Sequence, residues 1–517
     1  MTEPGVLMLI LFFSAVLYVV FKRRIARSSL SLPPGPKKLP LIGNLFDLPT
    51  TSPWEAYHEW SKMFNTDIIH LSVAGTSIIV LDTYDAATEL LEKRSSIYSG
   101  RVQLPMLNDL MGWNFDFAFM DYGDVWRDHR RLMNDFFNPS ASKQFRAQEL
   151  KAARRLLVRL LNNTDDITWN LRQMAGEIII SVAYGLQTKP KDDPYIRIAE
   201  QGVHPILEVS VPGAYLVDTI PLLKYVPSWL PGAGFKRQAQ KWKELAQKMV
   251  NVPYETMKSN MEKGIANPCF VLSCLQKITE GEDPIYNEYN IKCVAGTLFQ
   301  GIVAGSDTTV SLMSWSIITF LELPEIMVKV QQEIDSVVQL GHLPDFNDEN
   351  SMPYLTAVIK EILRWKVVGP LGLPHQLQAE DEYRGYRIPV GSLVVANVWH
   401  MLQDETVYPE PSKFIPERFM GKGSDVEAAE HQLNVFWGFG RRICPGRHLA
   451  FSSVWIALVS ILSVFDIVKA KDENGNVIEP VIECPPSLLL SPLPFKCEFR
   501  PCSKEAEAMI RSVIDDL

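Results

Sequence analysis

The chain has 517 residues, 47% of them hydrophobic, and its 51 Lys and Arg against 60 Asp and Glu give a formal net charge of −9. This length can bury a large core, and the hydrophobic content is that of a globular protein. The acidic balance gives no support to a nucleic-acid partner. The seven cysteines contain no Cys-x-x-Cys pair and no closely spaced even set, so we expect reduced thiols on the cytosolic side of a membrane.

The N-terminus carries an apolar run over residues 5–21, which a basic cluster over residues 22–27 follows at once. The run is at the short end of what spans a bilayer, and the basic flank would keep the rest of the chain cytoplasmic. A cleaved signal peptide is the rival interpretation, but the leader is not basic and no small-x-small cleavage site follows it. We therefore predict a membrane anchor with its flank (residues 1–28), a Pro-rich stiff hinge (29–45) and one large domain (46–517).

The next part of the chain predicts a hairpin and then a long helical region. Residues 68–73 and 76–81 predict a β-hairpin around Ala74-Gly75, and residues 84–93 predict a helix. From about residue 140 to 340, apolar residues recur at the helical period. Within this region, residues 211–231 contain four prolines and many apolar side chains. Such a kinked connection is typical of a lid or a second membrane contact, and equally of a buried irregular linker.

Two charged patterns have the spacing of one helix face. Trp126 and Arg130 are four residues apart, and Glu361 and Arg364 are three apart, which is close enough for an ion pair. Alone, the first pattern is typical of a solvated amphipathic helix, and Glu-x-x-Arg is common by chance.

Residues 304–309 (AGSDTT) lie within a helix predicted from about residue 288 to 322. Gly305 weakens this helix, and Ser or Thr hydroxyls bend helices by bonding back to carbonyls. A local widening would make room for dioxygen and water, and Asp307 and Thr308 are groups that can relay protons. Alone, the string is more typical of an ordinary helix with polar residues.

One cysteine has unusual neighbours. Cys444 lies in the loop WGFGRRICPGRHLA (residues 437–450), after a Gly-rich turn and just before a predicted apolar helix that starts near Leu449. The glycines allow a backbone to press against a large flat ligand. The helix N-terminus and Arg442 favour a thiolate, which is a soft ligand for metals such as haem iron. An isolated cysteine is otherwise most often a small buried side chain.

The loop resembles the cysteine-ligand loop of the cytochrome P450 monooxygenases, with Trp437 where that family usually has Phe. The other patterns resemble family motifs in the same order along the chain, so the resemblance covers nearly all of it. They are the family's Trp-x-x-x-Arg (126–130), its acid–alcohol pair (304–309), its Glu-x-x-Arg (361–364) and the segment that completes this pair into a buried triad (PERF, 416–419).

The resemblance implies the fold and the cofactor. The fold is mainly α with small β-sheets, the helical haem-enclosing prism of the cytochrome P450 catalytic domain, behind one N-terminal transmembrane helix. The cofactor is thiolate-ligated haem, with Cys444 as the axial ligand of the iron. The other roles carried over are propionate contacts for Trp126, Arg130, Arg442 and His375, proton delivery for Asp307 and Thr308, and a structural triad for Glu361, Arg364 and Arg418.

The implied activity inserts one oxygen atom of O2 into a lipophilic small molecule, by hydroxylation or epoxidation. The location implied is the endoplasmic-reticulum membrane, crossed once, with the catalytic domain in the cytosol. NADPH–cytochrome P450 reductase would supply electrons, and cytochrome b5 is a second candidate donor. A basic patch on the cysteine side would suit an acidic donor, and we expect it to contain Arg127, Arg131, Arg441, Arg447 and His448.

The substrate is indicated only as a class. Residues 212–231 resemble those of fungal enzymes acting on polyketides, terpenoids and polycyclic aromatics, so we expect a terpenoid or aromatic compound of secondary metabolism, or a xenobiotic. Two alternatives remain, namely a haem-thiolate isomerase or dehydratase that needs no reductase, and a non-enzymatic haem carrier or sensor. Thr308 and the basic patch argue against the first alternative, because enzymes of that kind commonly lack the threonine and need no electron donor. The stretches expected to face the substrate are mostly aliphatic and aromatic, at 103–119, 206–215, 299–304, 367–373 and 485–490.

Overall fold

The computed structural model describes residues 30–516 apart from 74, 163–165, 190–191, 210–212, 282, 302–303, 340, 481 and 485–488, and for 207, 304–307 and 514–516 it describes the backbone alone. The predicted anchor over residues 1–28 lies outside the described residues. Within the described ranges, no single helix is long and apolar enough to cross a bilayer. Thr308–Glu322 and Pro324–Val337 pass that test only as a pair, and they are bent by 105°.

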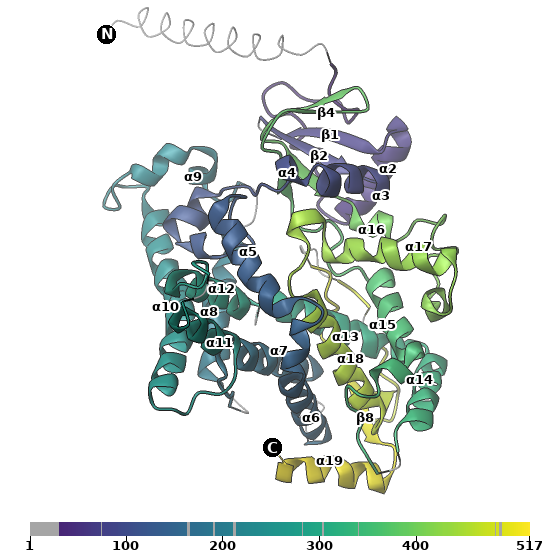
Figure 1. Ribbon diagram of the computed structural model, residues 1–517. Coiled ribbons are helices and arrows are strands. Elements are labelled where there is room, and N and C mark those ends of the chain that lie inside the picture. The colour runs from purple at the N-terminus through teal and green to yellow at the C-terminus, as the bar shows by residue number, and fades with distance from the viewer. Residues whose placement is uncertain are drawn as a thin grey trace, which may run out of the picture.

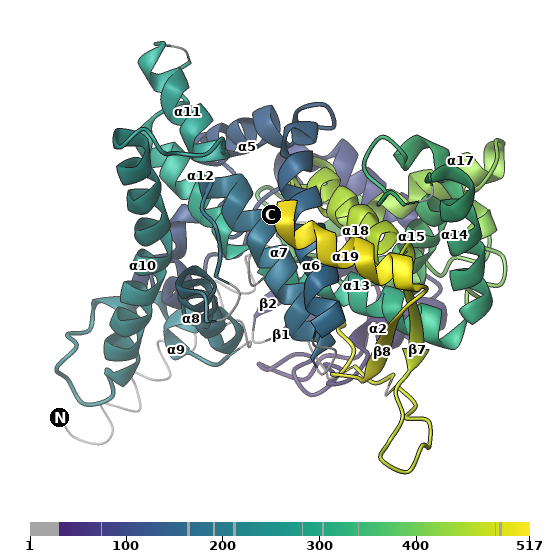
Figure 2. The ribbon, with the colours of Figure 1, turned by 90° about the horizontal axis from the view of Figure 1, so that it is seen from below.

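Helices make up most of the protein, in agreement with the predicted mainly α class (Figure 1). Both views show α8 and α10–α12 on one side, α14, α15 and α17 on the other, and α13 and α18 between them (Figure 2). The α-helices are α2 (Pro53–Phe64), α3 (Tyr84–Ala87), α4 (Ser95–Tyr98), α5 (Asp124–Phe137), α6 (Arg146–Asn162), α7 (Ile167–Tyr184), α8 (Pro194–Val209), α9 (Leu216–Thr219), α10 (Gly234–Glu262), α11 (Phe270–Thr279), α12 (Glu288–Gln300), α13 (Ala304–Glu322), α14 (Pro324–Val337), α15 (Pro353–Trp365), α16 (Val398–Met401), α17 (Ser424–Leu433), α18 (Arg447–Leu462) and α19 (Lys504–Asp516). Shorter π and 3-10 turns are η1 (Thr88–Lys93), η2 (Met106–Leu110), η3 (Trp113–Phe115), η4 (Ala141–Phe145), η5 (Pro221–Tyr225), η6 (Glu349–Ser351), η7 (Pro416–Phe419), η8 (Asn434–Trp437) and η9 (Gly440–Arg442).

The main sheet joins the N-terminal part of the chain to a segment far along it. Strands β1 (Ile68–Val73) and β2 (Thr76–Leu81) form the predicted antiparallel hairpin, with Gly75 at φ +89° in its turn. On its other edge, β2 pairs in parallel with β6 (Leu393–Ala396), and β6 pairs with β3 (His375–Gln376). Two small ladders complete the strands, β4 (Asp381–Tyr383) with β5 (Tyr386–Ile388) and β7 (Phe465–Lys469) with β8 (Cys497–Pro501).

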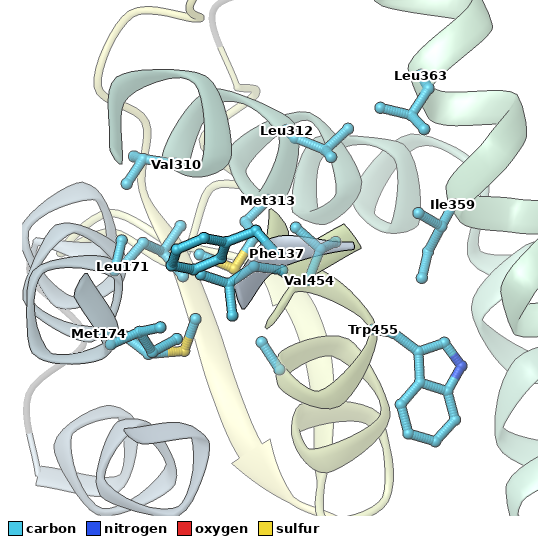
Figure 3. Packing of buried hydrophobic residues seen from close by; sticks show 14 of the residues in the cluster. Phe137, Leu171, Met174, Val310, Leu312, Met313, Ile359, Leu363, Val454 and Trp455 are labelled. Carbon is cyan, nitrogen blue, oxygen red and sulfur yellow. The ribbon is translucent and has the colours of Figure 1, made fainter. Parts of the chain in front are cut away.

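The core lies where α18 packs against α13, α15 and α6. Helix α18 is apolar all round, and every residue from Ser453 to Leu462 is buried, as expected for a central helix. Figure 3 shows side chains of α7, α13, α15 and α18 converging there. This packing makes α18 a rigid support for the cysteine loop that precedes it.

The helix predicted over residues 84–93 is confirmed, as α3 continued by the π-helical turn η1. Two other predictions about local structure need correction. The segment predicted as one helix over residues 288–322 is described as α12, which ends at Gln300, and α13, which begins at Ala304, so Gly305 lies inside α13. Residues 213–231 do not form a buried linker, because Leu216, Leu222 and Trp229 are exposed, the last at 76%.

Candidate functional site

The cysteine loop runs from η8 through η9 to the start of α18. The backbone N–H of Cys444 donates to the carbonyl of Trp437 at 2.7 Å and closes the loop on itself. Glycine is required at 440, where φ is +51° and an added Cβ would lie 2.4 Å from the carbonyl oxygen of Leu91 in η1. Gly438 has φ +86°, a conformation that strains other residues, whereas an added Cβ at Gly446 would meet no protein atom within 4 Å.

The thiol of Cys444 is less acidic than the sequence predicts. Burial raises its pKa, although the N–H groups of Gly446 and Arg447 and the guanidiniums of Arg130 and Arg447 favour the thiolate. The N–H groups at the helix terminus favour the thiolate as predicted, but burial outweighs them, and the cations that act on the sulfur are Arg130 and Arg447 rather than Arg442. A metal cation at the sulfur would add positive charge where a buried thiolate needs it.

Arg442 instead points into the protein. Its guanidinium donates to the carbonyls of Ser99, Phe117 and Met120 at 2.8–3.0 Å, and it lies 4.6 Å from the ring centroid of Trp126. Burial, together with neighbouring Arg101 and Arg130, lowers its pKa to about 9. The protein thus holds a guanidinium at a place that disfavours positive charge.

Arg101 makes a second cation of this kind, which the motifs did not predict. It is buried and donates to the carbonyls of Ala118, Leu373 and Pro374 at 2.7–3.2 Å. Burial lowers its pKa to about 10. A sequence signal existed, since Arg101 is the one charged residue between Arg94 and Asp109.

The predicted propionate contacts come together around these arginines. Trp126 and Arg130 share one face of α5, and Arg130 donates to the carbonyl of Ile443, beside Cys444, at 2.6 Å. His375 of β3 is buried, with Nδ1 2.7 Å from the carbonyl oxygen of Tyr98. Burial, and then Arg101 and Arg442, hold the pKa of His375 well below its usual range, so it is neutral.

We call Arg101, Arg130 and Arg442 the cation cluster, and neutral His375 lies beside them. None of its three arginines forms an ion pair with a carboxylate among the described residues; their recorded partners are carbonyl oxygens. Buried charges in proteins are normally paired, so the cluster favours a bound anion. A flat ligand with two carboxylates, lying beside Cys444, would meet this need. The propionates of haem are such a pair, and the residues present fit that cofactor.

The predicted proton-delivery residues lie at the start of α13. Thr308 is half buried in the first turns of this helix. The side chain of Asp307 lies outside the described residues. The neighbouring hydroxyl of Ser311 donates to the carbonyl of Leu490 at 2.7 Å and ties α13 to the C-terminal segment.

The Glu361–Arg364–Arg418 triad is present and buried. The carboxylate of Glu361 receives two bonds from Arg364, both at 2.8 Å, and lies 3.4 Å from Nε of Arg418 on η7. Arg364 also donates to the carbonyls of Leu402 and Lys413. The triad therefore fastens α15 to the segment that leads into the cysteine loop.

The predicted basic patch is partly neutralised. Arg127 pairs with Asp124, and Arg131 lies 2.6 Å from Asp283. Arg447 donates to the carbonyl of Cys444 at 3.0 Å. The patch therefore offers an electron donor fewer unpaired positive charges than the number of basic residues in the sequence indicates.

Asp116 is a further buried acid that the motifs did not predict. It follows η3, accepts the N–H of Ala118 at 2.9 Å, and meets the side chains of Thr297 and Gln300 on α12. Its Oδ2 has no hydrogen-bond partner among the described atoms. Burial raises its pKa to about 7.

We expect Asp116→Asn to stabilise the protein at neutral and alkaline pH. The native pKa of about 7 exceeds the ordinary 3.8, so folding favours the protonated acid. This stabilisation is fully present below about pH 4 and is lost as the pH rises through 7. At pH 8 the variant should be more stable by up to about 4 kcal/mol, from roughly 1.4 kcal/mol per pKa unit.

Urea unfolding between pH 4 and 8 measures this difference. The stabilities of Asp116→Asn and the parent should converge near pH 4, and exposed Glu473→Gln should follow the parent at every pH. Equal stability of Asp116→Asn and the parent at pH 8 would contradict the raised pKa.

Comparison with known proteins agrees with this geometry. Residues 33–499 match the family model described as Cytochrome P450. The chain is 42% identical to Cytochrome P450 monooxygenase 98 of Postia placenta, over 99% of this chain and 98% of that protein. It is also 42% identical to Tryptamine 4-monooxygenase of Psilocybe cyanescens (97% and 98%) and to Cytochrome P450 monooxygenase ple1 of Rhodocybe pseudopiperita (93% and 91%). The chain belongs to the cytochrome P450 family of haem-thiolate monooxygenases.

Proposed function

We propose that this protein hydroxylates or epoxidises a lipophilic aromatic or terpenoid compound, with electrons from NADPH delivered by a reductase. The observation that carries the site assignment is the cation cluster without carboxylate partners beside the Cys444 loop. Thiolate-ligated haem, when bound, supplies the redox chemistry that activates dioxygen.

The protein's own part begins with holding the cofactor. Cys444 is the thiolate ligand, and the N–H groups of Gly446 and Arg447 stabilise its charge. Arg101, Arg130 and Arg442 bind the propionates through charge-assisted bonds. His375 uses the single N–H of its neutral ring on the Tyr98 carbonyl, so it would donate to a propionate oxygen only with Nε2 protonated, a state that the negative charge of the propionate would favour.

The residues proposed to deliver protons, Asp307 and Thr308, lie at the start of α13. The Thr308 hydroxyl would donate a proton from Oγ1 toward dioxygen in the site, and Asp307, the adjacent acid, would replace that proton.

The proposed substrate class is supported by the segments of the chain that lie around Thr308. Val368, of residues 367–373, accepts a hydrogen bond from Leu490 at 2.7 Å. Phe115 lies close to Gly296 on α12, so residues 103–119 pack against the helix that leads to Thr308. The apolar character of these stretches favours a lipophilic molecule. An aromatic substrate is supported by the relative named for its action on tryptamine.

The proposed location is the endoplasmic-reticulum membrane. The predicted anchor precedes the hinge, and exposed Leu216, Leu222, Tyr225 and Trp229 of α9, η5 and the turn after them offer a second apolar contact. The cytosolic side would then present the cysteine loop to NADPH–cytochrome P450 reductase, with cytochrome b5 as a second donor.

The test is a titration of the ferric holoprotein with aromatic polyketides, terpenoids, tryptamine and steroids, followed by turnover with reductase and NADPH. We expect an aromatic or terpenoid ligand to shift the haem band toward high spin, because it displaces water from the iron. The same compound should then gain one oxygen atom in a reductase-dependent reaction.

Two results would contradict the proposed reaction, and a third would contradict the proposed substrate class. Rearrangement or dehydration of a ligand without NADPH would favour the isomerase alternative. Binding of haem with no NADPH consumption in the presence of any shifting ligand would favour a carrier or sensor. A band that shifts only with steroids would overturn the substrate class and leave the reaction class intact.

A further inference from the structure

A buried acid without a counter-charge lies between two of the segments that are expected to face the substrate. Asp116, in residues 103–119, is 0% exposed and meets the side chains of Thr297 and Gln300 near the end of α12. Burial, the N–H of Ala118 and these two side chains set its pKa, and no charged side chain is among them. Buried carboxylates in proteins are normally paired with a cation, so this acid calls for a partner from outside the chain.

Two oxygen atoms of this contact have no partner. Oδ2 of Asp116 and Oε1 of Gln300 are buried, and neither receives a hydrogen bond from any described atom. Because an ionised carboxylate only accepts, the amide of Gln300 meets it through its N–H group and keeps Oε1 for another donor. Both free atoms are therefore acceptors, and the ligand that satisfies them must donate hydrogen bonds.

A protonated amine satisfies both atoms at once. It carries three N–H donors and the positive charge that the buried carboxylate lacks. A hydroxyl group or a water molecule donates a hydrogen bond but brings no charge, so either would leave the carboxylate without a counter-ion.

The residues beside Asp116 suit an aromatic amine. The rings of Trp113 and Phe115 lie 5.0 Å apart, centroid to centroid. An added Cβ at Gly296 would lie 3.3 Å from the Phe115 ring, so this ring packs on α12 close to the helical turn that carries Thr297 and Gln300. Aromatic rings bind other aromatic groups and also attract ammonium groups.

The acid lowers the stability of the protein without a ligand. The stability expected for Asp116→Asn at pH 8 is higher than that of the parent, because the native carboxylate is buried without a cation. A charged side chain kept where its amide would be more stable is typical of a binding group.

We propose that Asp116 and Gln300 bind the protonated amine of the substrate, which is therefore a lipophilic arylalkylamine. Asp116 is a specificity-determining residue, and Gln300 positions its carboxylate and accepts a second N–H of the ammonium group. The inference rests on the proposed function, because it names the substrate class of the same site.

Spectral titration of the ferric holoprotein with matched ligand pairs tests this assignment. Each pair consists of an amine and the analogue that has a methyl group in place of the ammonium, namely tryptamine with 3-propylindole and 2-phenylethylamine with propylbenzene. We expect at least one amine to shift the haem band toward high spin with a Kd at least tenfold below that of its analogue, because only the amine forms a charge-assisted bond. The preference should disappear in Asp116→Asn. It should remain in Asp109→Asn, the matched control, which removes an exposed acid from η2 in the same segment.

The pH dependence of binding to the parent gives a second readout, which needs no variant. Alkylamines keep their proton between about pH 5.5 and 8.5, and neither Thr297 nor Gln300 titrates there. The ionised form of Asp116, whose pKa is about 7, is the form that binds the ammonium group. The Kd of the preferred amine should therefore be constant at about pH 8 and above, and should rise about tenfold for each pH unit below 7. The Kd of the methyl analogue should not change over this range.

Four results would overturn the proposal. They are equal affinity of every amine and its analogue, a preference that survives in Asp116→Asn, a Kd of the preferred amine that does not change with pH, and binding of the amines with a low-spin shift, which reports an amine nitrogen on the iron. All four are measured without reductase, so they leave the proposed reaction intact. Absence of NADPH consumption with a bound amine would contradict the proposed reaction and not the amine site.

Discussion

Glu361→Gln is expected to lower the free energy of unfolding by about 3–5 kcal/mol. The carboxylate is 0% exposed, as is the Arg364 side chain that it binds through two bonds. The same carboxylate accepts the backbone N–H of Ile415 at 2.9 Å. An amide keeps the shape of the side chain but leaves buried Arg364 without a counter-charge, and this is the source of the loss.

Loss of stability should be accompanied by loss of haem. Glu361 fixes Arg418 and Ile415, and the chain from there leads through α17 and η8 into the cysteine loop. Urea unfolding and the haem content of the purified variant measure both effects. Glu417→Gln is the matched control, because Glu417 is exposed in its pair with Lys329 and should cost less than about 1 kcal/mol. A Glu361→Gln protein as stable as this control would show that the triad does not hold the core.

The sequence predicted elements whose geometry is local. The hairpin has the residues predicted for it, because Gly75 supplies the positive φ of a two-residue turn between strands rich in Ile and Val. The Glu361–Arg364 pair is fixed by helical spacing alone. The family motifs then located most of the cation cluster.

Long-range register and burial could not be predicted in the same way. The β2–β6 pairing brings Asp82 beside Asn397, which donates to its Oδ1, and nothing near Asp82 in the sequence indicates Asn397. Helix α12 ends at Gln300 and Gly305 lies inside α13, although propensity alone indicates Gly305 as the weak position. The pKa of Cys444 depends on burial, which counts against the local helix terminus. Arg101 and Asp116 gain their importance from burial as well.

The carbon monoxide spectrum of the reduced protein tests the central assignment, thiolate ligation of haem by Cys444. Cys444→Ser is expected to lose the band of CO on thiolate-ligated haem and to abolish NADPH-supported oxygenation, while its far-UV circular dichroism is retained. Cys497→Ser is the matched control. Cys497 is also buried near the C-terminus, but it lies in β8, where burial and Glu498 raise its pKa to about 12. We predict that this control keeps the thiolate band. A thiolate band that persists in Cys444→Ser and disappears in Cys497→Ser would contradict the assignment of the cysteine loop.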